Sequence, residues 1–330
     1  MATKKREKFM VVNQLDILTR IRVMAGAVIE ILGGIFGFAP VQEYYVDTFN
    51  GDDDAHDGKS WSQAFATMTK ALDTVSTGGT VHFRGDVREE YVGSNLKFDI
   101  TIIGHGSLHH ADLPAAGYDT GAAIWRAPAS PTTATPLLEV RGRGWQFVNF
   151  MVDAPVDAAA FLLKRNALSG TSEYDASHAS FVGVRGVDGK HFVEDSGGCY
   201  NVTIDGCELK AFTAAAIVNS STAVANPLNW KIINNLFPPN VSDFGNVTHI
   251  DSPLNCAEIL NNVFGTVRST AKYIDLTGGN GNVVAKNILG GVYNTDDYVA
   301  GTGDIWLQNA VAVVAVTAPD GLTLAAPAAP

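Results

Sequence analysis

Hydrophobic and polar positions repeat along the second half of the chain. Three segments share one pattern, in which a short apolar strand is followed by an asparagine and then by two further apolar residues. They are Trp230–Phe237, Ala257–Phe264 and Asn282–Leu289, and Val202–Leu209 and Trp145–Phe150 fit upstream. Their asparagines, Asn235, Asn262 and Asn287, follow at intervals of 27 and 25 residues. A period in the twenties made of short strands predicts a β-solenoid, here a right-handed parallel β-helix.

The repeat also predicts which side chains fill the interior. Side chains alternate between the two faces of a strand, and each coil lies ~4.8 Å from the next. The expected core residues at the strand centres are Ile204, Ile232, Ile259 and Val284, with Phe237, Phe264 and Leu289 in the following strand. The three asparagines are expected to form an inward ladder, because their amides can bond one another and satisfy backbone groups of the turn.

A second row of strands lies between these segments. Its expected members are Ala215–Val218, Thr248–Asp251, Lys272–Asp275 and Asp304–Leu307. Ile217, Ile250 and Ile274 are expected to point into the core. The period of two then places a polar column outside, made of His249, Asp251, Tyr273 and Asp275.

The first 43 residues form a separate element. From Phe9 to Phe38 there is no proline, and glycine occurs only in the second half, which predicts a helical stalk. Steps of three and four residues give a heptad seam: Val11, Gln14, Leu18, Ile21, Ala25, Val28, Leu32 and Ile35. The apolar stripe around this seam is broader than a two-stranded coiled coil needs, so we expect a trimer or a higher bundle with the apolar seam residues at its interface.

Two other interpretations of this segment are less favoured. A secretory signal also has a basic start followed by apolar sequence, but Arg20, Arg22 and Glu30 interrupt the apolar part. A membrane span needs ~20 apolar residues, and the best uncharged run, Val23–Ile29, is far shorter. We therefore expect oligomerisation or anchoring to a partner, with no membrane span.

Residues 44 to 310 are expected to form the β-helix, followed at 311–330 by a last strand and an Ala/Pro-rich tail. The opening places Tyr45–Asp47 before a Gly/Asp-rich turn, then an amphipathic helix from about Trp61 to Val75, then Gly78-Gly79 and a strand. This order is similar to the opening of pectin-lyase-like β-helix domains, including those of bacteriophage tailspikes. The resemblance implies that the helix caps the open end of the solenoid. It implies little about activity, because that family includes lyases, hydrolases, adhesins and structural proteins.

Composition narrows the possible partners. The chain has 34 acidic and 23 Lys or Arg residues, and its net charge of -11 argues against binding to nucleic acid or to an anionic membrane. Three cysteines, Cys199, Cys207 and Cys256, have no metal-ligand spacing and are expected to be buried fillers in a protein assembled in reducing cytoplasm. The acidic cluster at 52–57 does not match a calcium-loop motif, so a solvated turn is favoured. No metal or cofactor is expected.

The polar column offers one candidate for catalysis. Asp251 and Asp275, one coil apart, would lie near the ~5 Å separation that retaining glycosidases use, as acid and nucleophile. Tyr273 could then stack on a sugar and His249 could shuttle a proton. Exposed aspartates are common on solenoid faces, however, and no further motif supports catalysis. We favour a solvated face and a protein that is not an enzyme.

An apolar column is expected on the outside as well. If Ile232 and its equivalents face inward, then Ile233, Leu260 and Ala285 face outward. Such a column indicates contact with another surface, either a second copy of the chain or a loop of the same chain.

These features lead to one principal hypothesis and two alternatives. The principal hypothesis is a homotrimeric bacteriophage virion component, such as a spike, fibre or decoration protein. It is anchored by its N-terminal helices to other virion proteins of the capsid or tail, and it presents the β-helix to surfaces or receptors. The first alternative is a tailspike-type depolymerase, a hydrolase or lyase of host surface polysaccharide. The second, a cellular adhesin, is weakened because we find no export signal.

Overall fold

The computed structural model describes residues 42–92, 97–106, 123–129, 134–165, 175–220, 226–238, 247–267, 272–290 and 297–311. The chain divides into two compact units, Met1–Gln42 and Glu43–Pro330. The predicted helical seam from Val11 to Ile35 and the tail beyond residue 311 lie outside the described residues. No helix among the described residues is long and apolar enough to cross a membrane.

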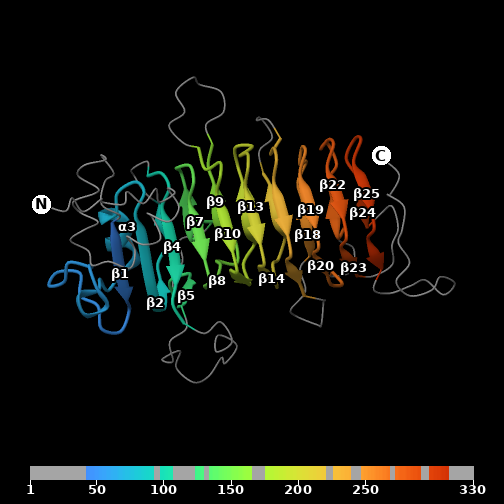
Figure 1. Cartoon of the computed structure of the whole chain (residues 1–330). Helices are drawn as coiled ribbons and strands as arrows, with labels where there is room; N and C mark the ends of the chain where they lie inside the picture. The colour runs from blue at the N-terminus through green and yellow to red at the C-terminus, as the bar shows by residue number, and fades with distance from the viewer. Residues whose placement is uncertain are drawn as a thin grey trace, which may run out of the picture. The chain divides into compact units, whose positions relative to one another are not determined.

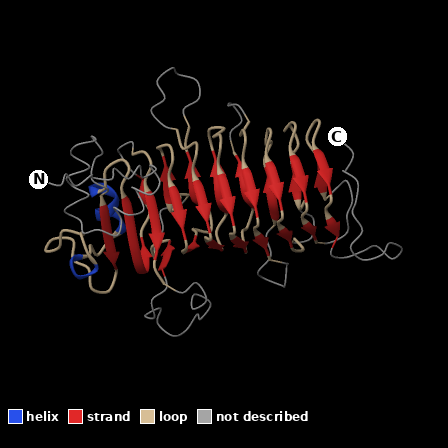
Figure 2. Ribbon diagram, in the orientation of Figure 1, coloured by secondary structure: helices blue, strands red, loops and turns tan. Residues whose placement is uncertain are grey.

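The second unit is a solenoid of short parallel strands (Figures 1 and 2), in which each coil contributes to three sheets. Sheet A contains β1 (Glu43–Asp47), the first half of β2 (Thr80–Arg88), β4 (Thr101–Gly104), β7 (Gln146–Val148), β10 (Ser180–Val182), β13 (Thr203–Asp205), β16 (Lys231–Ile233), β19 (Glu258–Leu260), β22 (Val283–Ala285) and β25 (Ile305–Leu307). Sheet B contains the second half of β2, β5 (Ala123–Arg126), β8 (Met151–Asp153), β11 (Arg185–Val187), β14 (Glu208–Lys210), β17 (Leu236–Phe237), β20 (Val263–Phe264), β23 (Ile288–Leu289) and β26 (Ala310–Val311). Sheet C contains β3 (Tyr91–Val92), β6 (Leu138–Val140), β9 (Ala159–Leu163), β12 (His191–Asp195), β15 (Ala215–Asn219), β18 (Thr248–Asp251), β21 (Ile274–Asp275) and β24 (Tyr298–Val299). The predicted parallel β-helix is confirmed.

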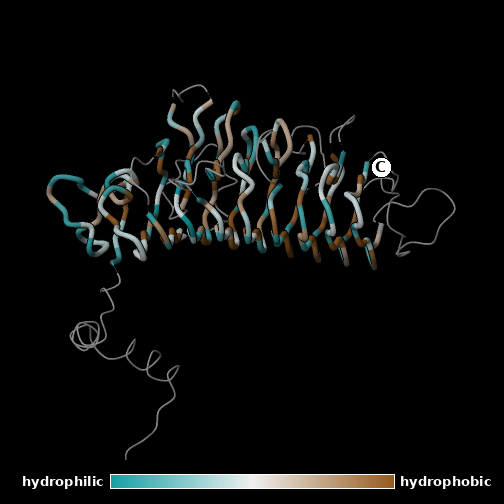
Figure 3. Tube along the Cα trace, turned by 90° about the horizontal axis from the view of Figure 1, so that it is seen from above, coloured by the Kyte–Doolittle hydropathy of each residue, from teal (hydrophilic) through white to brown (hydrophobic). Residues whose placement is uncertain are grey.

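The core follows the predicted register. Ile204, Ile232, Ile259 and Val284 pair in sequence along sheet A and are fully buried. Ile217, Ile250 and Ile274 form the corresponding buried row in sheet C. Phe237 stacks on Phe264, with ring centroids 4.7 Å apart, and Leu289 continues the row. Figure 3 shows the alternation of hydrophobic and hydrophilic residues recurring from coil to coil.

The corner between sheets A and B is the same in each of the later coils. A residue with positive φ is followed by one side chain that points inward, as at Asn261 (φ 57°) and Asn262. The Asn262 Oδ1 accepts hydrogen bonds from the backbone N–H and the amide of Asn235, and its Nδ2 donates to Ile232 O and to Asn287 Oδ1. The predicted ladder is therefore confirmed, and it extends one coil further, to Asn309.

The N-terminal coil carries a shorter helical segment than predicted. In place of one helix from about Trp61 to Val75, there is a 3-10 turn, η1 (Trp61–Gln63), and a helix, α3 (Met68–Thr74), which packs on β1 and β2. The Asp53 carboxylate accepts hydrogen bonds from the backbone N–H groups of Ala66 and Thr67, in the turn that joins the two pieces. The Glu89 carboxylate accepts from the first N–H groups of α3, at Met68 and Thr69.

Two further expectations are wrong. Residues 304–307 do not belong to the second strand row, because β25 pairs with β22 in sheet A and β24 supplies the last rung of sheet C. The last ladder step, from Asn287 to Asn309, is 22 residues, which is still within the predicted period in the twenties. Cys199 and Cys207 are buried as expected, but Cys256 is exposed, at a corner residue with φ 52°.

We predict that Asn262→Leu strongly destabilises the solenoid. Leucine cannot pair the Asn235 N–H or the Ile232 carbonyl, and each buried group left unpaired costs about 1–3 kcal/mol. Chemical denaturation of the variant measures the loss. Asn261→Gly is the matched control, because this side chain is exposed and glycine readily adopts its positive φ. If Asn262→Leu unfolds at the same denaturant concentration as the parent protein, the ladder contributes nothing to stability.

Candidate functional site

Asp251 and Asp275 lie side by side on the outer face of sheet C. They are direct register partners in β18 and β21. The preceding residues, Ile250 and Ile274, fill the core, so the pleat turns both carboxylates outward. Asp251 is exposed and Asp275 is half-buried. The predicted pairing of these two residues is correct, and adjacent strands hold their backbones ~4.8 Å apart.

The two carboxylates have different surroundings. The Lys272 ammonium lies 2.5 Å from Asp275 Oδ2, and the backbone N–H and hydroxyl of Thr277 donate to Asp275 Oδ1 at 3.0 and 2.5 Å. Burial alone raises the pKa of Asp275, but these hydrogen bonds outweigh it, and the pKa is lowered. For Asp251, burial and then the charge of Asp275 raise the pKa, with Lys272 acting in the opposite direction.

This pair has the electrostatic pattern of an acid and a base. Two neighbouring carboxyl groups whose pKa values are moved in opposite directions can take the proton-donating and the ionised role, respectively. The arrangement could therefore place a proton on Asp251 beside an ionised Asp275. Among the described residues, no group of three or more His, Cys, Asp or Glu side chains is arranged to hold a metal ion.

His249 and Tyr273 are not on the outer face, contrary to the prediction. His249 is fully buried and Tyr273 nearly so. The His249 ring lies against Phe237 and Phe264, with centroids 4.9 and 5.6 Å away. Tyr273 stacks on Tyr298 at 4.9 Å. Buried rings cannot form a surface on which a sugar stacks.

The hydrogen bonding of the backbone explains why His249 and Tyr273 point inward. The N–H groups of both His249 and Ile250 point to the carbonyl of Tyr273, and those of Tyr273 and Ile274 both point to the carbonyl of Asp297. Consecutive donors that share one acceptor interrupt the regular pleat, so the period of two holds only from Ile250 and Ile274 onward. His249 within β18 and Tyr273 just before β21 therefore turn inward together with the isoleucines that follow them.

Burial determines the protonation state of His249. Its Nε2 lies 2.8 Å from the Gly265 carbonyl, which can only accept, so Nε2 carries the proton. Removal from water disfavours the imidazolium and lowers the pKa of His249 to about 4, against the weaker opposing effect of the Gly265 bond. The ring is therefore a neutral core residue at pH 7.

A second surface feature lies at the corner between sheets A and B. Ile233 and Leu260, predicted to face outward, are half-buried register partners, whereas Ala285 in the same column is buried. Beside them runs a second column that the sequence analysis missed, in which Leu236 is 41%, Val263 37% and Ile288 45% exposed. We call these two columns the corner stripe.

The outward position of Leu236 agrees with the predicted inward positions of Asn235 and Phe237. A strict period of two continued from the outward Ile233 would instead place Leu236 inside. The positive φ of Asn234 inserts an extra step, so that Asn235 points in and Leu236 points out. One coil earlier, the same two columns carry Asp205 and Glu208. The outside thus changes from charged to apolar at β16 and β17.

Comparisons with known proteins identify the fold. No protein-family model matches the chain, and no curated protein matches it. A structure of XylC with xylose is similar with a TM-score of 0.53 and 11% identity, over 81% of this chain and 68% of that one. Pectate lyase Pel9A gives 0.48 and 14%, over 84% and 78%. ORF18 of Geobacillus virus E2 gives 0.39 and 13%, over 95% and 65%. At 11% identity the likeness to the XylC structure extends to the fold alone.

We predict that His249 makes the stability of the solenoid fall in mild acid. Because its folded pKa is about 4 and its unfolded pKa is ~6.5, the unfolded chain takes up the proton first, and stability is lost as pH falls from ~6.5 to ~4. The full effect is about 3 kcal/mol. Denaturation at several pH values should show a shallower dependence for His249→Phe, which keeps a ring against Phe237 and Phe264. Equal pH dependence of the two proteins would mean that His249 titrates normally.

Proposed function

We propose that this protein is a structural component of a bacteriophage virion, a spike, fibre or decoration protein, that acts as a homotrimer. Residues 1–43 anchor it to other virion proteins, and the β-helix is presented on the particle. The corner stripe is the observation that carries the proposal. The resemblance of residues 45–91 to the opening of tailspike β-helices supports the phage assignment.

The stripe favours a second copy of the same chain as its partner. In a parallel assembly of identical solenoids, each coil faces the equivalent coil, so apolar rungs of one copy meet apolar rungs of the next at the same height. The charged positions Asp205 and Glu208 lie in the same columns but before the stripe begins. A chain with a net charge of -11 gains from keeping carboxylates out of a contact between copies.

The stripe is small for an interface. Three coils at ~4.8 Å span less than ~15 Å, so the stripe is too short to bury the ~800 Å² per partner of a typical stable complex. Lateral contact through the stripe therefore adds to association through the N-terminal segment, which the heptad seam of Leu18, Ile21 and Ile35 supports.

We expect Val263→Lys to weaken the trimer of the full-length chain. A lysine at the centre of the stripe places equivalent ammonium groups against each other and removes apolar burial, which should raise the dissociation constant at least ~10-fold. Val92→Lys is a matched control, because Val92 is 46% exposed and lies on sheet C, away from the corner between sheets A and B. Light scattering across a concentration series measures both. The proposal fails if the two variants assemble equally well.

A glycan hydrolase is the second candidate function. The opposite pKa shifts of Asp251 and Asp275 favour it, with Asp251 as general acid and Asp275 as nucleophile on host surface polysaccharide. Against it stands the loss of the two predicted sugar contacts, since His249 and Tyr273 are buried. We retain the structural role as the main proposal.

The main proposal predicts that Asp251→Asn and Asp275→Asn change neither assembly nor any release of reducing ends from host capsule or lipopolysaccharide. Asp251→Asn should also leave stability unchanged, while Asp275→Asn, which alters the bonds to Lys272 and Thr277, should cost up to about 1 kcal/mol. A reducing-end assay and thermal unfolding on the same samples test this. A loss of turnover by ~100-fold or more in a folded variant would establish the hydrolase instead.

A further inference from the structure

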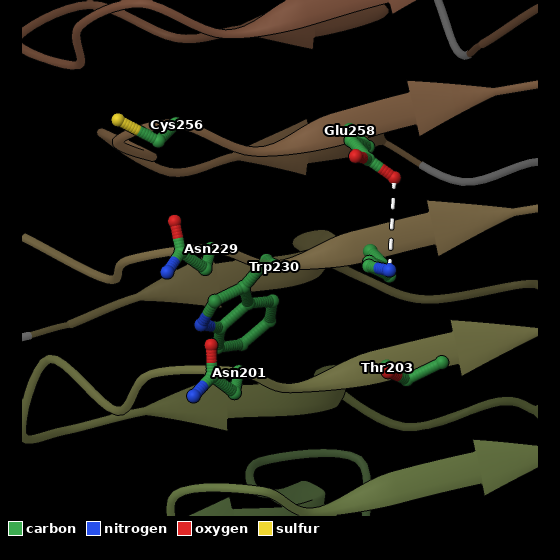
Figure 4. A pocket seen from close by; sticks show the side chains of 7 residues that line it. Asn201, Thr203, Asn229, Trp230, Cys256 and Glu258 are labelled. Carbon is green, nitrogen blue, oxygen red and sulfur yellow. Dashed lines mark ion pairs between the residues drawn. The ribbon is translucent and has the colours of Figure 1, made fainter.

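A polar groove crosses three coils at the corner where the chain enters sheet A. Figure 4 shows its two sides. Asn201, Asn229 and Cys256 form one side, Thr203 and Glu258 lie opposite, and the Trp230 ring lies between them. Lys231 completes the lining, and the hollow has a volume of about 400 Å³.

Both sides of the groove are fixed by the register of the solenoid. Asn201, Asn229 and Cys256 all have positive φ, between 52° and 56°, and the bridges from Tyr200 to Leu228 and from Leu228 to Asn255 stack these corners. On the other side, Thr203, Lys231 and Glu258 are consecutive register partners. The floor is rigid, because Trp230 is buried and its Nε1 donates to the Cys199 carbonyl.

The lining combines donors and acceptors without net charge. An asparagine amide has two N–H donors and one carbonyl acceptor, and the Thr203 hydroxyl can both donate and accept. The Asn201 Nδ2 also lies 3.1 Å from His178 Nε2, so part of its donor capacity is used within the protein. The Lys231 ammonium and the Glu258 carboxylate are 3.9 Å apart, exposed, and cancel each other's charge. Such an exposed ion pair contributes little to stability, so its two groups can be redirected to a ligand at small cost.

This chemistry selects for one class of ligand. An anion would face Glu258, a cation would face Lys231, and an apolar group would cover the amide of Asn229 without offering it a hydrogen bond. A ligand rich in hydroxyl groups can both donate and accept at every position. Because the groove crosses coils, such a ligand would extend along the solenoid axis.

We propose that this groove binds uncharged pyranose units of a saccharide chain. It lies at a different corner from the corner stripe and on a different sheet from Asp251 and Asp275, so binding here requires neither assembly nor catalysis. Affinity is modest, because the Trp230 ring is buried and provides no open face for a sugar to stack on.

Cys256 provides a position-specific reporter. It is the exposed cysteine among the three and lies in the groove, while Cys199 and Cys207 are buried. Burial raises the pKa of the Cys207 thiol to about 12 and also raises the pKa of the Cys199 thiol. Neither buried cysteine therefore competes with Cys256 for a thiol reagent in the folded protein.

The test measures the rate at which iodoacetamide alkylates Cys256 in the full-length chain, with mass spectrometry to identify the site. The probes are uncharged oligosaccharides of glucose, galactose and mannose and, for comparison, an oligomer of galacturonic acid. We expect at least one uncharged probe to slow alkylation saturably at concentrations up to ~10 mM. Protection by none of them, or equal protection by the charged oligomer, would overturn the inference.

A pair of matched variants tests the role of the groove asparagines. Asn229→Gly removes an amide from the groove, and Asn261→Gly removes one from the opposite corner; glycine adopts the positive φ of both. Calorimetric titration with the protecting probe should show binding weakened at least ~10-fold, equivalent to about 1.4 kcal/mol, by the first variant alone. Unchanged binding by Asn229→Gly, or equal weakening by both variants, would also overturn it.

Discussion

The structure depends on how the backbone is satisfied at the corner between sheets A and B. A parallel coil must turn there without leaving buried N–H and carbonyl groups unpaired. The chain meets this need with a left-handed residue followed by an inward asparagine, whose amide bonds the coils on both sides, as Asn262 does to Asn235 and Asn287. Because every bond of the ladder joins neighbouring coils, it also fixes their register. The register of the coils determines which residues stack into each column on the surface.

The regular parts of the fold could be predicted from the sequence. Side-chain alternation within a strand identified Ile232, Ile259 and the inward asparagines, because pairing at one fixed spacing places like residues on like. Prediction failed where the pleat is interrupted. His249 precedes the regular part of β18 and turns inward, although alternation from Ile250 places it outside. This reversal depends on backbone hydrogen bonds that a pattern of apolar residues does not encode.

Differences in coil length were a second feature that could not be predicted from the sequence. The ladder spacing falls from 25 to 22 residues at the last coil, and this change moved Ile305–Leu307 into a different sheet from the one predicted. The groove along Asn201 and Asn229 was missed for a related reason. Neighbouring residues on each side of the groove are 27 or 28 positions apart in the sequence, and only the register of the coils brings them together. The pairing of Asp251 with Asp275, in contrast, lies within regular strands and was predictable.

The solenoid thus separates its surface features by sheet and corner, with the acidic pair on sheet C, the corner stripe between sheets A and B, and the groove at the corner between sheets C and A. In a trimer, each groove would be present three times, and a weak saccharide site gains avidity when several copies engage one chain. The proposed side-by-side arrangement of identical solenoids can be seen by electron microscopy of the purified full-length chain. We expect particles with threefold symmetry in which three parallel solenoids touch along one corner. Isolated single solenoids would rule this arrangement out.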